Sequence, residues 1–256
     1  MRQPRLAIAQ PDIVRLLDQH SLRIFRRSDL EKVLADNREY LRLTRSTTTS
    51  RFIDFLLART RLKMVKLKFP SRKEVRYILG DVSPYALALS IRPRSYLTHY
   101  SAMHIHGLTE QIPKTVYVNA EQPQKRVPNA SLTQERIDAA FRHPPRKSKN
   151  RAVLPGVTVC LLAGMHTGQL GVIQAKIPTG ETVSVTNIER TLIDIVVRPF
   201  YAGGIYEVLE AYRRARGSLS INKLVATLKK LDLPPKNCTK CSESSSRQEG
   251  RKGALV

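Results

Sequence analysis

The chain of 256 residues contains few cysteines and no long uninterrupted apolar run. Its three cysteines, Cys160, Cys238 and Cys241, cannot form the disulfide framework of a small secreted protein. The longest stretch without Asp, Glu, Lys or Arg covers residues 152–175, but a proline and several glycines interrupt it, so it does not predict a membrane-spanning helix. The first residues contain no apolar block of the kind found in secretory signals. We therefore expect a cytoplasmic protein with no membrane partner.

Sequence motifs of the common enzyme classes are also missing. The chain contains no G-x-x-x-x-G-K-[ST], H-E-x-x-H or G-x-S-x-G pattern. His104 and His106 form an H-x-H pair, but no third metal ligand is set by nearby spacing. Cys238 and Cys241 form one C-x-x-C pair without the second pair that a zinc site would need. The sequence therefore predicts neither a metal site nor a bound cofactor.

Carboxylates near well-patterned sequence are scarce. Glu189 and Asp194 are five residues apart, which places them on different faces of a helix. A magnesium-dependent nuclease or nucleotidyltransferase needs several carboxylates that converge on the metal. Asp194 is better placed to pair with Arg190 or Arg198, each four residues away on a helix. We therefore predict that the protein is not an enzyme and assign no catalytic residue.

Acidic residues are outnumbered throughout the chain. The sequence has 44 Lys and Arg against 21 Asp and Glu, for a formal net charge of +23 and a pI near 10.4. Residues 1–81 alone hold 19 basic and 9 acidic side chains. An excess of this size indicates attraction to a polyanion, such as nucleic acid.

The first third of the chain predicts three short helices. Apolar residues recur there at helical spacing in three groups, namely Ile13, Leu16 and Leu17; Leu30, Val33 and Leu34; and Phe52, Ile53, Phe55 and Leu56. Ser28 and Glu31 have the spacing of a capping box at the start of the second helix. On the third helix Arg51, Asp54 and Ala58 line up opposite the apolar residues, so this face is expected to be exposed.

A basic β-hairpin is predicted directly after these helices, over residues 62–80. Apolar and basic residues alternate from Leu62 to Phe69, and Pro70-Ser71 forms the turn. In the second strand Arg72, Glu74 and Arg76 are expected to point outward. Three helices followed by a hairpin is the order of a winged helix-turn-helix, so residues 1–81 are predicted to be a DNA-binding domain of this type.

The winged helix-turn-helix prediction assigns a role to each element. The third helix would present Thr48, Thr49 and Arg51 to base edges in the major groove, because recognition helices enter by their N-terminal end. The hairpin would place basic side chains along the phosphates, namely Lys66, Lys68, Arg72 and Lys73. The alternative is that these charges only keep a small helical domain soluble.

The rest of the chain predicts a mixed α+β domain over residues 82–232. A helix is expected over residues 95–103, and strands over 115–119, 157–162, 170–177 and 182–186. Thr186 and Glu189 suggest a second capping box before the last three helices. Residues 233–256 are polar and of low complexity, which predicts a disordered tail. The predicted fold class is α+β, with an N-terminal winged helix-turn-helix followed by a mixed α+β C-terminal domain.

Two segments of this second domain resemble a known family. The segments YLTHYSAMHIHGLTEQIPKTVYV (residues 96–118) and VTNIERTLIDIVVRPFYAGGIYEVLEAYRRA (residues 185–215) are similar to the AbiEi antitoxins of bacterial type IV abortive-infection toxin-antitoxin systems. The likeness covers most of residues 10–231. Its motifs are Ser101-Ala102 with His106-Gly107-Leu108, the strand Val116-Tyr117-Val118, Glu189-Arg190-Thr191 with Asp194, and Gly203-Gly204.

This resemblance implies a function in two parts. The N-terminal winged helix-turn-helix would bind double-stranded DNA at the protein's own promoter and act as a transcriptional repressor. The C-terminal antitoxin domain would counteract a nucleotidyltransferase-like toxin encoded beside it, without a stable complex. DNA contact is implied for Thr48, Thr49, Arg51 and the hairpin from Lys66 to Arg76, whereas no catalytic residue is implied.

Two other functions stay open on the sequence alone. A nucleic-acid-processing enzyme could use Glu189, Asp194 and a histidine such as His104. A general RNA-binding or ribosome-associated protein would also explain the positive charge. The predicted order of three helices and a hairpin favours DNA binding over both.

Overall fold

The computed structural model describes residues 5–124, 133–135, 138, 142 and 145–231, and the predicted tail over residues 233–256 lies outside them. Within these residues the protein is a mixed α+β structure with two sheets, which confirms the predicted fold class at that level. None of the helices in the described part of the chain has the length and apolar character needed to cross a membrane.

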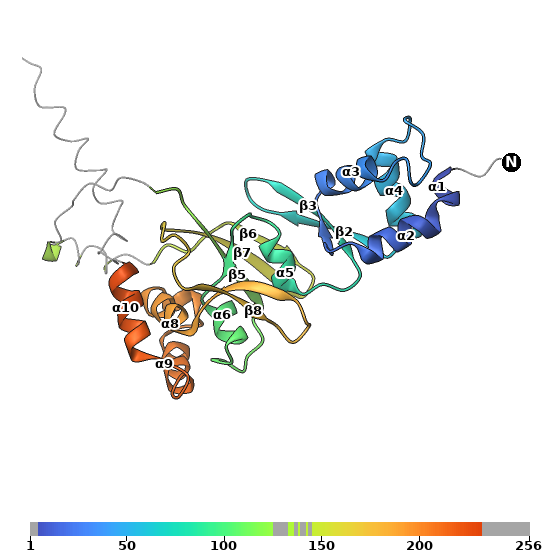
Figure 1. Ribbon diagram of the computed structural model, residues 1–256. Helices are drawn as coiled ribbons and strands as arrows, with labels where there is room; N and C mark the ends of the chain where they lie inside the picture. The colour runs from blue at the N-terminus through green and yellow to red at the C-terminus, as the bar shows by residue number, and fades with distance from the viewer. Residues whose placement is uncertain (1–4, 125–132, 136–137, 139–141, 143–144, 232–256) are drawn as a thin grey trace, which may run out of the picture.

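Residues 5–79 form the N-terminal lobe, at one end of the molecule (Figure 1). Its elements are α1 (Arg5–Ile8), α2 (Gln10–Gln19), β1 (Ile24–Phe25), α3 (Arg27–Asp36), α4 (Thr49–Arg59), β2 (Leu62–Lys68) and β3 (Lys73–Leu79). The three strands form an antiparallel sheet in which β3 lies between β1 and β2. The three predicted helices and the hairpin are therefore confirmed, whereas β1 was missed because two residues carry no readable alternation.

The N-terminal lobe is built around its own apolar cluster. Phe25, Leu30, Phe52 and Leu56 are fully buried in it, and they come from β1, α3 and α4. Burying a side chain of this size stabilises the fold by about 1.5 to 3 kcal/mol. The hairpin joins the cluster through the residues near its open end, namely Leu62, Val75, Tyr77 and Leu79.

The remaining described residues form the main lobe. Its elements are α5 (Pro84–Leu89), β4 (Tyr96–Leu97), α6 (Tyr100–Ile105), β5 (Thr115–Glu121), β6 (Arg151–Leu154), β7 (Val157–Gly164), β8 (Val172–Lys176), β9 (Thr182–Thr186), α8 (Ile188–Val197), the 3-10 helix η1 (Pro199–Tyr201), α9 (Ile205–Arg214) and α10 (Ile221–Leu231). The strands form one sheet in the order β6-β7-β5-β4-β9-β8. The pairs β5–β7 and β4–β9 are parallel, and the others are antiparallel.

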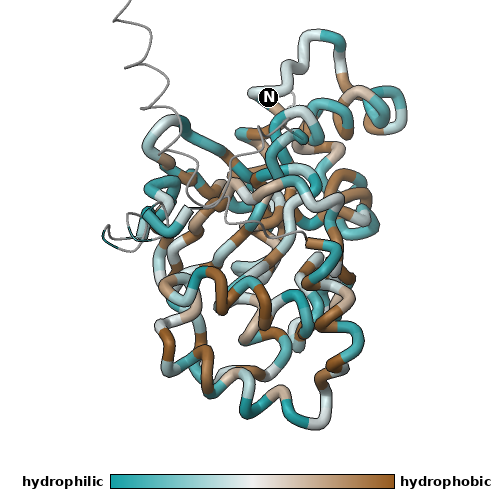
Figure 2. The backbone as a smooth tube through the Cα atoms, turned by 90° about the vertical axis from the view of Figure 1, so that its left-hand side faces the viewer, coloured by the Kyte–Doolittle hydropathy of each residue, from teal (hydrophilic) through white to brown (hydrophobic). Residues whose placement is uncertain are grey.

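The sheet of the main lobe is covered on both faces. Val159 and Leu161 of β7 share an apolar cluster with Ala88 of α5 and with Leu67 and Phe69 of the hairpin. Cys160 and Leu162 alternate with them along β7 and contact Tyr201 of η1 on the opposite face. Helices α8, α9 and α10 gather at the end of the molecule farthest from α1 to α4 (Figure 1). Figure 2 shows hydrophobic positions running through the strands and recurring on the helices at the bottom of that view.

The predicted helix over residues 95–103 is wrong in its first half and confirmed from Tyr100 onward. Tyr96 and Leu97 form the short strand β4 in the middle of the sheet, and α6 begins only at Tyr100. His99, between them, has a positive φ of 52°. Both β4 residues are almost completely buried, because the strand has neighbours on both sides. Their sequence is therefore continuously apolar, and such a run fits a helix as well as a strand.

Both predicted capping boxes are wrong. Helix α3 starts at Arg27, and the Asp29 carboxylate accepts a 2.7 Å hydrogen bond from the backbone N–H of Arg26. Helix α8 is capped by Asn187, whose Oδ1 accepts a 2.8 Å hydrogen bond from the N–H of Arg190. Asp29 takes the third helical position of α3 and Asn187 is the N-cap of α8, so in both helices a neighbouring polar residue replaces one chosen from spacing.

Candidate nucleic-acid interface

The N-terminal turn of α4 carries the three residues predicted to contact bases. Thr48 is the N-cap, and its Oγ1 accepts a hydrogen bond of 3.3 Å from the N–H of Arg51. Thr48 and Arg51 are exposed and Thr49 is half-buried, whereas Phe52 and Ile53 of the same turn point into the lobe. The local geometry therefore leaves the Arg51 side chain outside the lobe at the end of the helix where backbone N–H groups favour anions.

Two further arginines hold this turn in place. Arg38 donates from Nη1 to the carbonyl of Thr44 at 2.6 Å and from Nη2 to that of Thr47 at 3.2 Å, which fixes the connection that leads into α4. Arg27 donates from Nη2 to Oγ of Ser50 at 2.7 Å and is itself exposed. Sequence analysis missed Arg27, because its nearness to α4 depends on how α3 and α4 pack.

The hairpin register places three lysines on one face. Lys66 pairs with Val75 and Lys68 pairs with Lys73, and directly paired residues project from the same side of an antiparallel sheet. Leu62 and its partner Leu79 continue this face toward the open end of the hairpin, where they pack among the helices. Lys66, Lys68 and Lys73 are all exposed, so they extend the helix-facing side of the hairpin beyond the helices.

The arginines of β3 and of the turn lie on the opposite face. Arg76 pairs with Val65 and is only 4% exposed, and its guanidinium donates to the carbonyl of Ser90 at 3.1 and 3.3 Å and to that of Ile91 at 3.3 Å. The expectation that Arg76 points outward is therefore wrong. This second face of the hairpin is covered, because it packs against the main lobe through Leu67.

Arg72 is also engaged within the protein. Its Nε lies 3.1 Å from Oε1 of Glu74, and its guanidinium carbon lies 5.6 Å from the centre of the Phe69 ring. Its side chain is 24% exposed. The structure therefore does not bring Arg72 and Arg76 together with the three lysines, and the surface that can meet a phosphate is smaller than the sequence suggested.

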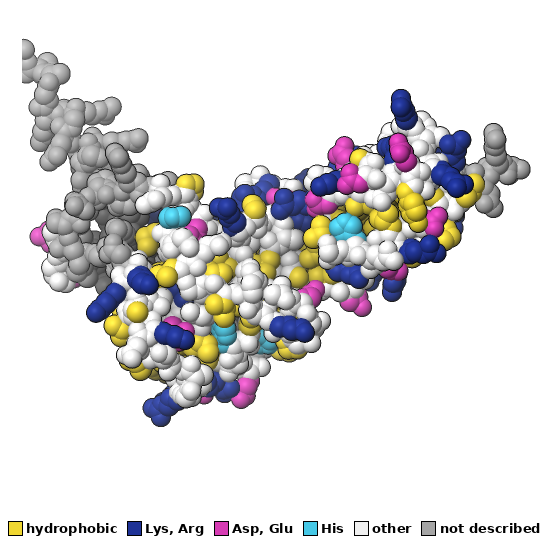
Figure 3. Space-filling view, viewed as in Figure 1, with side chains coloured by type: hydrophobic (Ala, Val, Ile, Leu, Met, Phe, Trp, Pro, Cys, Tyr) yellow, Lys and Arg dark blue, Asp and Glu magenta, His cyan; other side chains and the backbone are white. Residues whose placement is uncertain are grey.

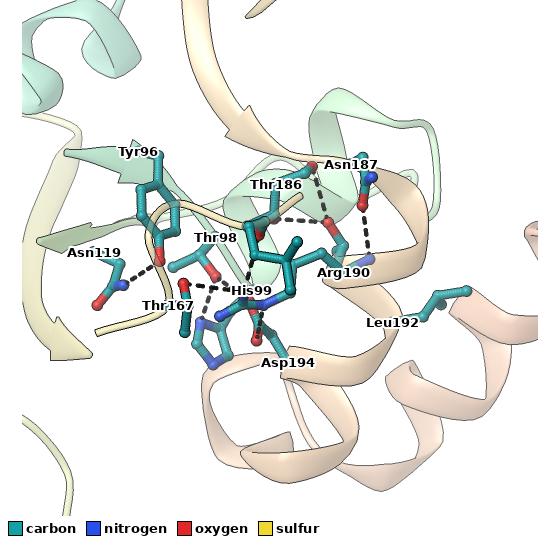
Figure 4. A network of polar contacts seen from close by, with 12 residues as sticks. Tyr96, Thr98, His99, Asn119, Thr167, Thr186, Asn187, Arg190, Leu192 and Asp194 are labelled. Atoms are coloured by element: carbon teal, nitrogen blue, oxygen red, sulfur yellow. Dashed lines mark hydrogen bonds and ion pairs between the residues drawn. The ribbon is translucent and has the colours of Figure 1, made fainter. Parts of the chain in front are cut away.

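A second polar cluster lies inside the main lobe (Figure 4). Nε of Arg190 lies 2.8 Å from Oδ1 of Asp194, as predicted from their spacing, and Oγ1 of Thr98 donates to Oδ2 of Asp194 at 3.1 Å. His99 contacts the same Thr98 hydroxyl through Nδ1 at 3.1 Å. The pKa of His99 is lowered to about 4, chiefly because the ring is buried; the Asp194 carboxylate opposes this lowering, and the cations of Arg198 and Arg190 contribute to it.

Glu121 ties a loop to this cluster. Its carboxylate accepts hydrogen bonds from the N–H of Thr167 at 2.9 Å, from the hydroxyls of Thr167 and Tyr96, and from the N–H of Gln169. Burial alone would raise the pKa of Glu121, but these hydrogen bonds outweigh it and lower the pKa. Arg190 holds the same loop from its other side, through the carbonyl of Leu170 at 3.0 Å. The cluster therefore fastens the loop to the sheet.

The residues of the enzyme alternative are not brought together. Glu189 accepts from the N–H of Ser220 at 3.4 Å, whereas Asp194 faces Arg190. His104 contacts the hydroxyl of Tyr85 at 3.0 Å. Within the part of the chain that the structure describes, no group of three His, Cys, Asp or Glu side chains could hold a metal ion.

Residues of the AbiEi-like motifs contact one another across the main lobe. Oγ of Ser101 accepts from the N–H of Tyr117 at 2.8 Å, and Nε2 of His106 donates to the carbonyl of Thr186 at 2.6 Å. The Thr186 and Thr191 hydroxyls lie 2.8 Å apart. The contact between His106 and Thr186 joins the two similar segments, and the other two contacts hold each segment internally, so a structural role explains the residue types.

The chain matches no protein-family model and no curated protein. The likeness to AbiEi antitoxins therefore stays a likeness of short motifs. What supports a function is the charge, exposure and register of the residues described above.

Proposed function

We propose that the protein binds double-stranded DNA through its N-terminal lobe, which we interpret as a winged helix-turn-helix over residues 1–81. The order α2, β1, α3, α4, β2, β3 supports this interpretation, as does the position of β3 between β1 and β2. In this arrangement α3 and α4 are the helix-turn-helix, α4 is the recognition helix, and the β2–β3 hairpin is the wing.

One observation carries the proposal. Lys66, Lys68 and Lys73 share the face of the hairpin that packs against the helices, and Arg51 is exposed at the N-terminal turn of α4. Among the described residues none of these four side chains forms an ion pair, so their charges are available to an external anion. Figure 3 shows basic side chains over the hairpin, with acidic ones interspersed over the helices beside it.

Arg51 and the three lysines would have different roles in DNA recognition. Arg51 would form paired hydrogen bonds with a guanine in the major groove, a contact that discriminates between bases by about 1 to 3 kcal/mol. The three lysines would lie along the phosphates and set the position of the protein on the duplex without reading its sequence. Thr48 and Thr49 complete the end of α4 that would enter the groove.

As the biological role we propose repression of the protein's own promoter and antitoxin activity. The support for this role is the similarity of residues 96–118 and 185–215 to AbiEi antitoxins. The functional partner would be a nucleotidyltransferase-like toxin from the neighbouring gene, counteracted without a stable complex. Coexpression with that neighbouring gene tests the role: growth should be restored by this chain, and continued growth arrest would refute antitoxin activity.

DNA binding is tested by titrating the full chain with its upstream region, with shuffled DNA of equal length and with an RNA duplex. We expect preference for the upstream DNA and a strong salt dependence, because each neutralised phosphate contributes about 0.9 to the log-log slope and four to six contacts give about −4 to −5. A slope near zero, or equal affinity for shuffled DNA, would refute sequence-specific binding. Stronger binding of the RNA duplex would favour the RNA-binding alternative.

A further inference from the structure

A second basic segment lies outside the N-terminal lobe. The sequence between Asp138 and Glu181 has no acidic residue, and its basic residues crowd at the start of β6. Arg146, Lys147 and Lys149 are exposed there. In the described ranges these three side chains form neither a hydrogen bond nor an ion pair within the chain, whereas Arg151 next to them donates to the carbonyl of Ser148 at 3.2 Å. We call Arg146, Lys147 and Lys149 the β6 basic segment.

The backbone of this segment is held by the sheet. Oγ of Ser148 donates to the carbonyl of Leu161 at 2.8 Å, and the N–H of Ser148 donates to the hydroxyl of Tyr201 at 2.7 Å. The N–H of Leu161 in turn donates to the carbonyl of Asn150 at 2.9 Å. Cations on a fixed backbone lose less conformational freedom on binding than cations on a loose loop, so they bind an anion with less entropic cost.

The β6 basic segment lies next to the wing. Strands β2 and β6 contact each other, and Leu67 of β2 and Ala152 of β6 belong to the same apolar cluster. The four residue steps from Lys147 to Arg151 span at most about 14 Å. Leu67 lies on the hairpin face opposite Lys66, Lys68 and Lys73, so a duplex that contacts these lysines must extend past the hairpin to reach the β6 basic segment. Figure 3 shows basic side chains over the hairpin and over the adjoining end of the sheet.

We propose that the β6 basic segment is a second phosphate-binding surface for the same duplex, so that the main lobe lengthens the DNA footprint of the wing. This inference rests on the proposed function. The competing explanation is that lysines near an edge strand only prevent pairing with other chains, and it predicts no change in DNA binding when they are removed. The length of DNA needed for full affinity separates the two explanations.

The test uses the full chain with Lys147→Gln and Lys149→Gln combined. Binding is measured over a range of salt concentrations on two duplexes with the same upstream site, one of about one turn and one of about four turns. On the longer duplex the salt slope of the double variant should fall by about 1.8, which is about 0.9 for each lost phosphate contact. On the shorter duplex the slopes of variant and wild type should agree.

A matched control removes the same charge elsewhere. Lys223 and Lys229 are exposed on α10, at the far end of the molecule, and their double change to Gln should leave both slopes unchanged. An equal loss of slope in this control would overturn the inference, because net charge alone would then explain it. The inference would also be overturned if the wild type binds the longer duplex and the variant with Lys147→Gln and Lys149→Gln binds it with the same salt slope. If the wild type binds neither duplex, the proposed DNA-binding function itself is refuted.

Discussion

Lys68 and Lys73 lie directly opposite each other across the β2–β3 hairpin, on the face that also packs against the helices. Like charges in this position repel and destabilise a hairpin. Both side chains are exposed, and in the described residues no carboxylate pairs with either of them. A polyanion bound there would neutralise both charges and remove this repulsion. The pair is therefore the reason for treating this end of the hairpin as functional.

Lys73→Gln should therefore have opposite effects on stability and on DNA binding. Removing one of the two charges relieves the repulsion, so the free energy of unfolding should rise by a few tenths of a kcal/mol up to about 1 kcal/mol. The salt slope of DNA binding should fall by about 0.9, which corresponds to one phosphate contact. Urea denaturation and DNA titration of the same sample measure both. A less stable variant with unchanged salt dependence would show that Lys73 has only a structural role.

Arg51→Ala should weaken specific binding and leave the fold intact. Loss of a paired contact to guanine costs about 1 to 3 kcal/mol of preference for the upstream site over shuffled DNA. Arg51 is exposed and has no ion-pair partner in the described residues, so stability should change by no more than about 0.5 kcal/mol. Arg59→Ala is the control, because Arg59 is exposed at the other end of the same helix. Equal losses of preference in both variants would contradict the assignment of Arg51.

Arg76→Met should affect stability and not the electrostatics of binding. The change removes the hydrogen bonds to the carbonyls of Ser90 and Ile91 and the ion pair with Glu74, so the free energy of unfolding should fall by about 2 to 4 kcal/mol. Thermal unfolding measures this loss, with Lys66→Met as an exposed control of similar size. A variant that keeps its melting temperature but loses salt dependence would show that Arg76 contacts phosphate after all.

His99 should make the stability of the main lobe depend on pH. Burial lowers the pKa of His99 from 6.5 to about 4, so the unfolded chain binds a proton more readily than the folded one between these values. The stability is fully present above pH 6.5 and falls as the pH drops toward 4, by about 3 kcal/mol in all. His99→Asn should lose less stability over this window in urea denaturation. If the variant and the wild type lose the same free energy of unfolding between pH 6.5 and 4, His99 does not cause the pH dependence.

Sequence patterns were most reliable where one face of an element is buried. Helices α2, α3 and α4 and the strands of the hairpin follow from clear periods of 3.6 and 2. Strand β4 fits the pattern of a helix because Tyr96 and Leu97 are buried on both sides and carry no alternation. The short strand β1 and helix α5 were missed for a related reason, since a few residues cannot define a period.

The candidate interface was predicted only in part, because alternation within one strand does not tell which face it shares with the next. The hairpin register places Lys66 and Lys68 on the face of Val75 and Tyr77, and it places Lys63 and Arg76 on the face of Val65. Each strand therefore contributes charged residues to both faces of the hairpin. Such an arrangement is stable only because the main lobe covers the second face, through contacts that are far apart in sequence.

The most direct test of the DNA-binding face is the salt dependence of binding when its three lysines are neutralised together. The full chain with Lys66→Gln, Lys68→Gln and Lys73→Gln is titrated with the upstream duplex beside the wild type. A shared phosphate-binding face predicts that the log-log slope falls by about 2.7, which is about 0.9 for each lysine, while the fold is retained. A triple variant that binds the duplex with the wild-type slope would contradict the proposed interface.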